Sequence, residues 1–180
     1  MLNVYSESEN VIHVKGSKFM YGWILLALNG GVFACLLITH GLKFDSSYSL
    51  IYLGGGIMCL PFFLYITFWT LPGFIPGKIL LTIYQGENGT IKSKKDIVYF
   101  KNIRNIDIVR NPFNLINDVI IDTFDNKTIK IWTYNLLDEL AFQVLVDQYI
   151  YPYMTENSRN VWDRKLDLVK LKEITKYERV

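Results

Sequence analysis

The chain has 180 residues and a formal net charge of +2, so it has room for one modest domain with extensions. A charge this small excludes nucleic-acid binding through the overall field of the protein, and any basic function must be local. Apolar residues make up 51% of the sequence, and they are concentrated in its first half.

Residues 1–18 are polar, and we expect them to form a cytosolic leader. Two apolar segments without formal charge follow, at residues 19–39 and 49–71. Each has the length of about 20 residues that a helix needs to cross a bilayer. The leader carries both acidic and basic residues, and no small-x-small cleavage site follows the first segment. We therefore predict an uncleaved membrane anchor and not a signal peptide.

The connection between the two apolar segments, residues 40–48, is too short to form a domain. Two spans place both termini on the same side of the membrane. Lys15, Lys18 and Lys78 flank the spans on that side, whereas Lys43 lies in the connection. Because Lys and Arg are enriched in cytoplasmic loops, we predict a multi-pass protein of the cell membrane with both termini in the cytoplasm.

Small residues occur within both spans, and such residues allow helices to approach closely. We expect them to pack the two helices on each other, with self-association or binding of a partner as the alternative. The spans contain no acidic or basic side chain, which argues against an ion pathway. The small residues are Gly30, Gly31 and Ala34 in the first span and Gly54, Gly55 and Gly56 in the second.

After two Pro-Gly pairs in residues 71–78, the pattern changes to short alternating runs that are typical of strands. We expect an antiparallel β-rich domain over residues 77–154. A helical pattern follows, with Asn135 as its expected N-cap and Pro152 at its end. The six predicted strands cover residues 79–84, 90–94, 97–101, 104–110, 118–124 and 128–134.

The last segment, residues 155–180, is rich in charge and has opposite charges at helical spacing, such as Asp167 and Lys170. We predict a charged helical tail. Either it is solvated and partly frayed, or it contacts the membrane or a partner through Trp162, Leu166 and Val169.

No catalytic constellation is visible in the sequence. The two histidines, His13 and His40, have no metal-ligand neighbours at a useful spacing, and no nucleophile has a nearby base. Asp118 and Asp122 share a predicted strand face, which we interpret as solvated and not as a cation site. We therefore predict that the protein is not an enzyme and holds neither a metal nor a cofactor.

Residues 90–111 contain six basic and two acidic side chains. An antiparallel meander that starts at the membrane divides these charges between the two ends of the domain, with Lys101 and Arg104 at the far end. We expect the near group to face anionic lipid headgroups, with ordinary solubilising charges as the alternative. The near group consists of Lys78, Lys94, Lys95 and Arg110.

A transmembrane hairpin, short strands and one capped helix together resemble small bacterial (Firmicutes-like) membrane proteins with a pleckstrin-homology-like (PH-like) domain. The resemblance rests on a basic hairpin, an I-x-x-I strand, the D-x-I-I-x-T-x-D-N-K hairpin at residues 118–127 and the helix that follows. It implies an α+β fold over residues 77–152, in which a C-terminal helix closes an antiparallel barrel or sandwich. The family barrel has seven strands, and the seventh would come from residues 112–117 or 10–15. The resemblance implies no catalytic residue.

We therefore expect a membrane-anchored, non-catalytic interaction or scaffold module that uses a cytosolic PH-like domain at the inner membrane surface. Its expected partners are the lipid bilayer, anionic lipid headgroups, and a protein or a second copy of itself; nucleic acid is not among them. The alternative is a membrane accessory or immunity factor that acts through its transmembrane hairpin, in toxin protection or as a secretion or transport subunit.

Overall fold

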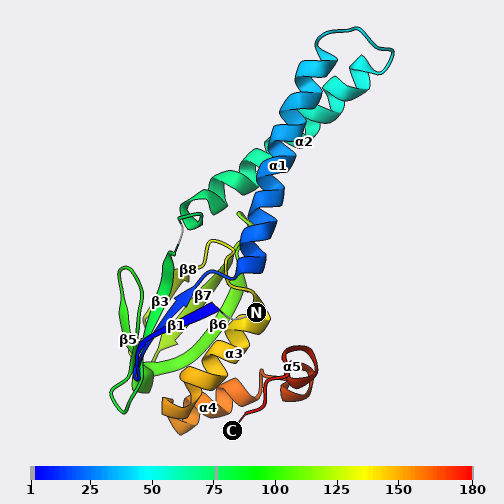
Figure 1. Ribbon diagram of the computed structural model, residues 1–180. Helices are drawn as coiled ribbons and strands as arrows, with labels where there is room; N and C mark the ends of the chain where they lie inside the picture. Colours follow the sequence, from blue (N-terminus) through cyan, green and yellow to red (C-terminus); the bar gives the residue numbers. More distant parts are fainter. Residues whose placement is uncertain (1–2, 76, 180) are drawn as a thin grey trace.

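The computed structural model describes residues 3–75 and 77–179. Two long helices form a hairpin that projects from one end of an α+β domain (Figure 1). The chain leaves the domain to enter the hairpin and returns to the same end of the domain afterwards. The combination of an apolar helical hairpin with an α+β domain of antiparallel sheets agrees with the sequence-based prediction.

The hairpin consists of α1 (Lys18–Gly41) and α2 (Ser49–Thr70), and a short 3₁₀ turn (Leu71–Gly73) follows α2. Both helices are long and apolar enough to cross a membrane, by length and composition. Within the protein, 17% of the most apolar stretch of the first helix is buried, and 6% of the corresponding stretch of the second. The core helices of a soluble domain would be mostly buried, so the apolar surface of this hairpin lacks a protein cover in the described chain.

The two helices pack through small residues. A Cβ atom added to Gly30 would lie 2.4 Å from the ring of Phe63, and one added to Gly56 would lie 2.8 Å from the carbonyl oxygen of Ala34. Gly31 is in ordinary contact with Phe63. In the second glycine group, Gly56 alone packs against the other helix of the hairpin, because successive residues of a helix point about 100° apart. Added Cβ atoms at Gly54 and Gly55 would meet nothing within 4 Å.

The domain contains two antiparallel sheets that are hydrogen-bonded separately. Of the expected barrel or sandwich, the closed barrel is therefore wrong. One reason is that a 3₁₀ turn, Phe100–Asn102, leads the chain out of the first sheet before the second begins. The larger sheet has the order β1 (Asn3–Ser8), β2 (Val11–Lys15), β3 (Ile79–Tyr84), β4 (Thr90–Lys92) and β5 (Ile97–Tyr99), and the smaller one has β6 (Ile103–Arg110), β7 (Asn117–Thr123) and β8 (Thr128–Trp132).

The segment that we expected to be a polar leader supplies two of these strands. β2 pairs with β3, although the whole helical hairpin lies between these two strands in the sequence. Val14 is opposite Leu81, and Lys15 is opposite Ile79. Val14 is fully buried, so the first residues of the chain belong to the domain core. Of the two sources considered for an additional strand, residues 10–15 overlap β2, and residues 112–117 form mainly a loop that β7 follows.

Helix α3 (Glu139–Tyr149) contributes Phe142 and Leu145 to the core shared by both sheets. Its N-cap is Asp138, whose carboxylate accepts a hydrogen bond from the Ala141 amide at 2.8 Å. The expected cap at Asn135 is wrong, because the chain there makes a tight turn with positive φ (59°) before the helix starts.

The tail packs on the domain as two short helices, α4 (Glu156–Asp163) and α5 (Leu168–Thr175). Asp167 interrupts the expected single helix, since its side chain caps α5 by accepting from the Lys170 amide. Trp162 and Leu171 are buried, whereas Val169 is exposed. A solvated, frayed tail is therefore not what the structure shows.

Candidate functional site

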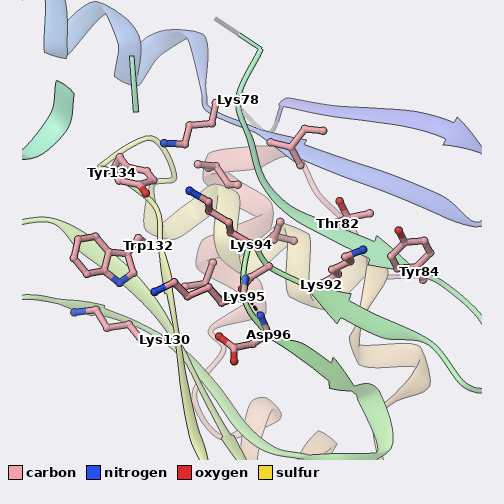
Figure 2. A pocket seen from close by; sticks show the side chains of 15 residues that line it. Lys78, Thr82, Tyr84, Lys92, Lys94, Lys95, Asp96, Lys130, Trp132 and Tyr134 are labelled. Carbon is pink, nitrogen blue, oxygen red and sulfur yellow. Dashed lines mark hydrogen bonds between the residues drawn. The ribbon is translucent and has the colours of Figure 1, made fainter. Parts of the chain in front are cut away.

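A pocket of about 590 Å³ opens between the start of β3, the turn that joins β4 to β5, and the end of β8 (Figure 2). Its lining combines apolar and aromatic side chains, among them Leu81, Trp132 and Tyr134, with a group of lysines. We call it the lysine-rich pocket. Its lysines are Lys78, Lys92, Lys94, Lys95 and Lys130.

The β4–β5 turn places two of these lysines at the end of the domain that faces the helical hairpin (Figure 1). The Ser93 amide donates to the Asp96 carbonyl at 2.8 Å, and the Ser93 hydroxyl accepts from the amides of Lys95 and Asp96. Lys94 and Lys95 therefore occupy the tip of a turn whose backbone is held by its own hydrogen bonds.

Lys78 is held by two contacts of its amino group. Its amino group lies 3.7 Å from the centre of the Tyr134 ring and donates to the carbonyl of Pro72. Burial, and secondly the positive charge of Lys94, lower the pKa of Lys78. The pocket is thus a place where like charges repel one another and where an anion would be favoured.

The lysines of the pocket differ in their pairing. Lys130 forms an ion pair with the buried Asp118 at 2.9 Å. None of the other four pocket lysines has an ion-pair partner within the part of the chain that the structure describes. Asp96 is the one acidic residue in the lining as described. The pocket therefore carries positive charge that the described protein does not neutralise.

Three of the four residues expected to face headgroups come together in this pocket: Lys78, Lys94 and Lys95. Arg110 does not line it, because it ends β6 in the other sheet, opposite Asn117. Several further polar or aromatic lining residues were not predicted to face headgroups, and four of them bear on the chemistry of the pocket. These are Lys92, Lys130, Trp132 and Tyr134; the last three alternate along and beyond β8, but the sequence does not reveal which strand β8 approaches.

Contacts join both helices of the hairpin to the domain next to the pocket. The Ser17 amide, one residue before α1, donates to the Leu136 carbonyl at 2.8 Å. On the other side, Gly73 packs so closely on Tyr134 that an added Cβ would lie 2.6 Å from it. The Tyr21 hydroxyl also donates to the Gly73 carbonyl at 3.3 Å. These contacts tie both helices to the domain beside the pocket.

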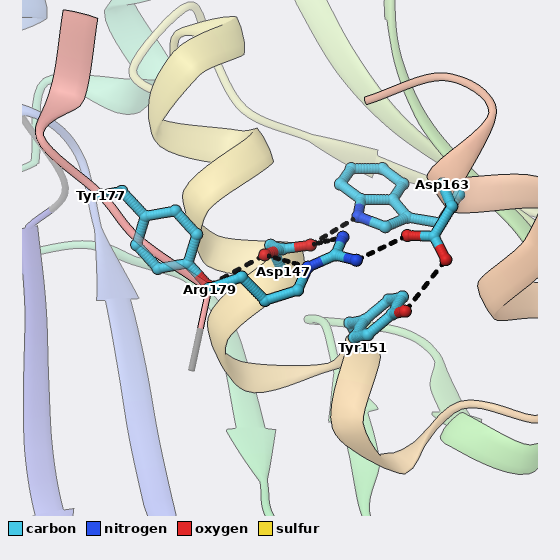
Figure 3. A network of polar contacts seen from close by, with 6 residues as sticks. Asp147, Tyr151, Asp163, Tyr177 and Arg179 are labelled. Atoms are coloured by element: carbon cyan, nitrogen blue, oxygen red, sulfur yellow. Dashed lines mark hydrogen bonds and ion pairs between the residues drawn. The ribbon is translucent and has the colours of Figure 1, made fainter. Parts of the chain in front are cut away.

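A second polar cluster lies under the C-terminal tail (Figure 3). The buried carboxylate of Asp147 accepts hydrogen bonds from Trp162 Nε1 at 3.0 Å, the Tyr177 hydroxyl at 2.9 Å and Arg179 Nε at 3.0 Å. Arg179 also pairs with Asp163 at 2.7 Å. Burial and the bond to Asp147 raise the pKa of Tyr177. We call these residues the Asp147 network; all of its charges are paired, and it holds the tail on α3.

The described residues contain no group of three or more His, Cys, Asp or Glu side chains that could hold a metal ion. Asp118 and Asp122, which share a strand, have other partners. Asp118 pairs with Lys130, while Asp122 accepts from the Thr128 hydroxyl at 2.7 Å and from Asn105 at 3.3 Å. The Thr128 hydrogen bond is the main cause that lowers the pKa of Asp122.

Fold and pocket together define a small α+β domain that carries a lysine-rich pocket beside an apolar helical hairpin. The chain belongs to a family of unknown function, DUF5381, whose model matches residues 10–172. That match contains both long helices, the whole pocket and most of the tail.

Two curated relatives come from Bacillus subtilis (strain 168). One, an uncharacterized lipoprotein, YfjD, is 31% identical over 162 residues, which cover 87% of this chain and 88% of the relative. The other, the uncharacterized protein YfjE, is 32% identical over 130 residues, which cover 69% of this chain and 86% of the relative. Both agree with the expected bacterial, Firmicutes-like character. No solved structure matches the chain, and the PH-like resemblance stays a prediction.

Proposed function

We propose that this protein is a non-catalytic interaction module that α1 and α2 anchor in the cell membrane. Its domain, which we propose to be PH-like, lies at the cytoplasmic surface, and the lysine-rich pocket binds anionic lipid headgroups there. The observation that carries the proposal is the surplus of unpaired lysines at the end of the domain that the helical hairpin holds in place.

The sheet supports a two-pass topology. Because β2 precedes α1 and β3 follows α2, the pairing of these strands requires both ends of the hairpin to lie on the same side of the membrane. Lys15, Lys18 and Lys78 flank that side and Lys43 the other, which favours the cytoplasm for the domain. An N-terminal tag that becomes accessible only in inside-out vesicles is the expected result, and accessibility in intact cells would contradict this orientation.

One relative is called a lipoprotein, and lipid attachment at a new N-terminal cysteine would require cleavage of the chain before that cysteine. The two cysteines of this chain, Cys35 and Cys59, lie within α1 and α2. Cleavage before Cys35 would remove β1 and β2, including the buried Val14. We therefore propose that this chain keeps its N-terminal strands, so that the same tag stays attached to the mature protein.

The attraction between the lysines and anionic lipid is large enough to orient a domain that the helices already tether to the membrane. A lysine near an anionic leaflet contributes about 1 kcal/mol, so four unpaired lysines contribute on the order of 4 kcal/mol. The apolar and aromatic lining next to these charges fits the boundary between a headgroup and its acyl chains.

The test uses the full chain in neutral detergent micelles, titrated with short-chain phosphatidylglycerol and, as the neutral reference, short-chain phosphatidylcholine. We expect binding of the anionic lipid alone. The double variant Lys94→Glu/Lys95→Glu should weaken that binding by at least about 2 kcal/mol, or roughly thirtyfold.

The matched control is Lys101→Glu/Lys127→Glu, which makes the same change in net charge at exposed positions outside the pocket. It should leave the affinity within a factor of about two. An equal loss of affinity in both double variants would mean that net charge alone explains the effect. Unchanged binding in Lys94→Glu/Lys95→Glu would rule out the pocket as the headgroup site.

A further inference from the structure

The loop between β6 and β7, residues 111–116, exposes apolar side chains beside the helical hairpin. Phe113 is 83% exposed and Leu115 is 45% exposed. Two large apolar side chains at the tip of a polar loop are costly in water unless they have a partner.

The loop contacts α2 directly, since the Tyr65 hydroxyl donates a hydrogen bond to the Phe113 carbonyl. Tyr65 lies one helical turn before Trp69, the aromatic residue near the domain end of α2, and the two rings pack edge to face. At about 1.5 Å per residue, Tyr65 is about 12 Å from Gly73, where the apolar helical segment ends. The loop therefore reaches back along α2, past the end of that segment.

Much of the backbone of the loop is hydrogen-bonded within the loop. The Asn111 amide donates to the Ile116 carbonyl, and the Leu115 amide donates to the Asn111 carbonyl, both at 2.9 Å. The side chains of Asn111 and Asn114 accept from the amides of Phe113 and Ile116, at 2.9 and 3.1 Å. Pro112 has no amide hydrogen. Pairing of these four amides lowers the cost of bringing the loop to the membrane interface, although not into the hydrocarbon region itself, where irregular loops are not tolerated.

We infer that the 111–116 loop inserts Phe113 and Leu115 into the cytoplasmic leaflet next to α2. The occupant of this apolar surface is lipid because the loop continues the exposed apolar surface of α2, where Leu64 and Phe68 are 56% and 72% exposed. Tyr65 lies about 12 Å along α2 from the end of the apolar segment, which is of the same order as the depth of about 5–10 Å at which interfacial apolar residues lie. The inference rests on the proposed membrane position of α2 but not on headgroup binding by the lysine-rich pocket.

The test places one environment-sensitive fluorophore on Phe113→Cys in a Cys35→Ser/Cys59→Ser background. The full chain is reconstituted into vesicles of phosphatidylcholine alone, so that anionic headgroups do not contribute. We expect blue-shifted emission, and we expect quenching by nitroxide lipids labelled near the headgroup to be several-fold stronger than quenching by iodide. Asn126→Cys, at the exposed β7–β8 turn, is the matched control and should show the reverse order of quenching.

Iodide quenching of the Phe113→Cys label equal to that of the control would overturn the inference, since the loop would then lie in water. Protection of the label from both quenchers would also overturn it, because protein would then cover the loop. Leu115→Cys provides a second labelling position in case the first label disturbs the contact with Tyr65. Either result leaves the phosphatidylglycerol titration unaffected, so failure here is distinguishable from failure of the proposed headgroup site.

Discussion

Charged side chains are paired at one end of the domain and unpaired at the other. Under the C-terminal tail, Asp147 is fully buried and its carboxylate is satisfied by Trp162, Tyr177 and Arg179. At the end next to the helical hairpin, Lys94 and Lys95 are exposed at the tip of a turn without an ion-pair partner in the described chain. The paired charges under the tail contribute to the fold, whereas the unpaired lysines are the charges that we propose to bind an anion from outside it.

Mutations should therefore separate the two ends: those under the tail should change stability, and those at the unpaired lysines should change ligand binding alone. Lys130 is informative because it lines the pocket and is nevertheless paired with Asp118.

The largest effect is expected from Arg179→Gln. The substitution leaves the buried carboxylate of Asp147 with only neutral donors, and removal of one partner from a buried ion pair costs about 3 kcal/mol. Chemical unfolding of the full chain in detergent, followed by circular dichroism, measures the loss. Arg164→Gln, at an exposed position with no ion pair in the described structure, is the control and should stay within about 0.5 kcal/mol of wild type. Equal stability of the two variants would mean that the Asp147 network does not hold the fold.

Lys130→Gln should come next, with a loss of about 2 kcal/mol, because it leaves the buried carboxylate of Asp118 without its cation. The same unfolding measurement applies. Lys92→Gln changes an unpaired lysine of the same pocket and should leave stability nearly unchanged. If both variants were destabilised alike, the distinction between paired and unpaired lysines would lose its basis.

The smallest effect is expected from Tyr177→Phe, which removes one hydrogen bond to Asp147 at a cost of about 1 kcal/mol. Since the folded protein raises the pKa of Tyr177, the unfolded chain ionises first as the pH increases. The stability contributed by this hydroxyl is complete below the ordinary tyrosine pKa of about 10 and declines above it.

Unfolding free energies measured at pH 8 and at pH 10.5 test this sign. The variant should lose less stability between the two pH values than the wild type does. Some dependence will remain, because burial raises the pKa values of Tyr149 and Tyr151 as well. A steeper decline in the variant would contradict the assignment.

Much of the domain could be predicted because its strands follow one another with short turns. The predicted strand at residues 79–84 has the bounds of β3, and the strand predicted at 118–124 is shifted by one residue from β7. Alternation and turn residues are local signals, and antiparallel neighbours obey them. Three of the four lysines and arginines assigned to the near end do meet in one pocket for the same reason.

What the sequence did not reveal depends on contacts between distant segments. β2 lies in one of the two segments considered for a seventh strand, but its partner β3 lies beyond both long helices, so no local pattern shows where it pairs. Asp147 has the appearance of a helix surface residue, and only the return of Arg179 explains its burial. The position of Arg110 depends on the break between the two sheets, which no local pattern marks.

The pairing of β2 with β3 also sets the order of events during synthesis. The ribosome makes β2 first, and its partner strand does not exist until the whole helical hairpin has been made. At a synthesis rate of about 5–20 residues per second, β2 waits roughly several seconds without its neighbour. The membrane insertion of the helices that we propose therefore has time to precede completion of the sheet, and the finished sheet then joins the two ends of the helical hairpin through backbone hydrogen bonds.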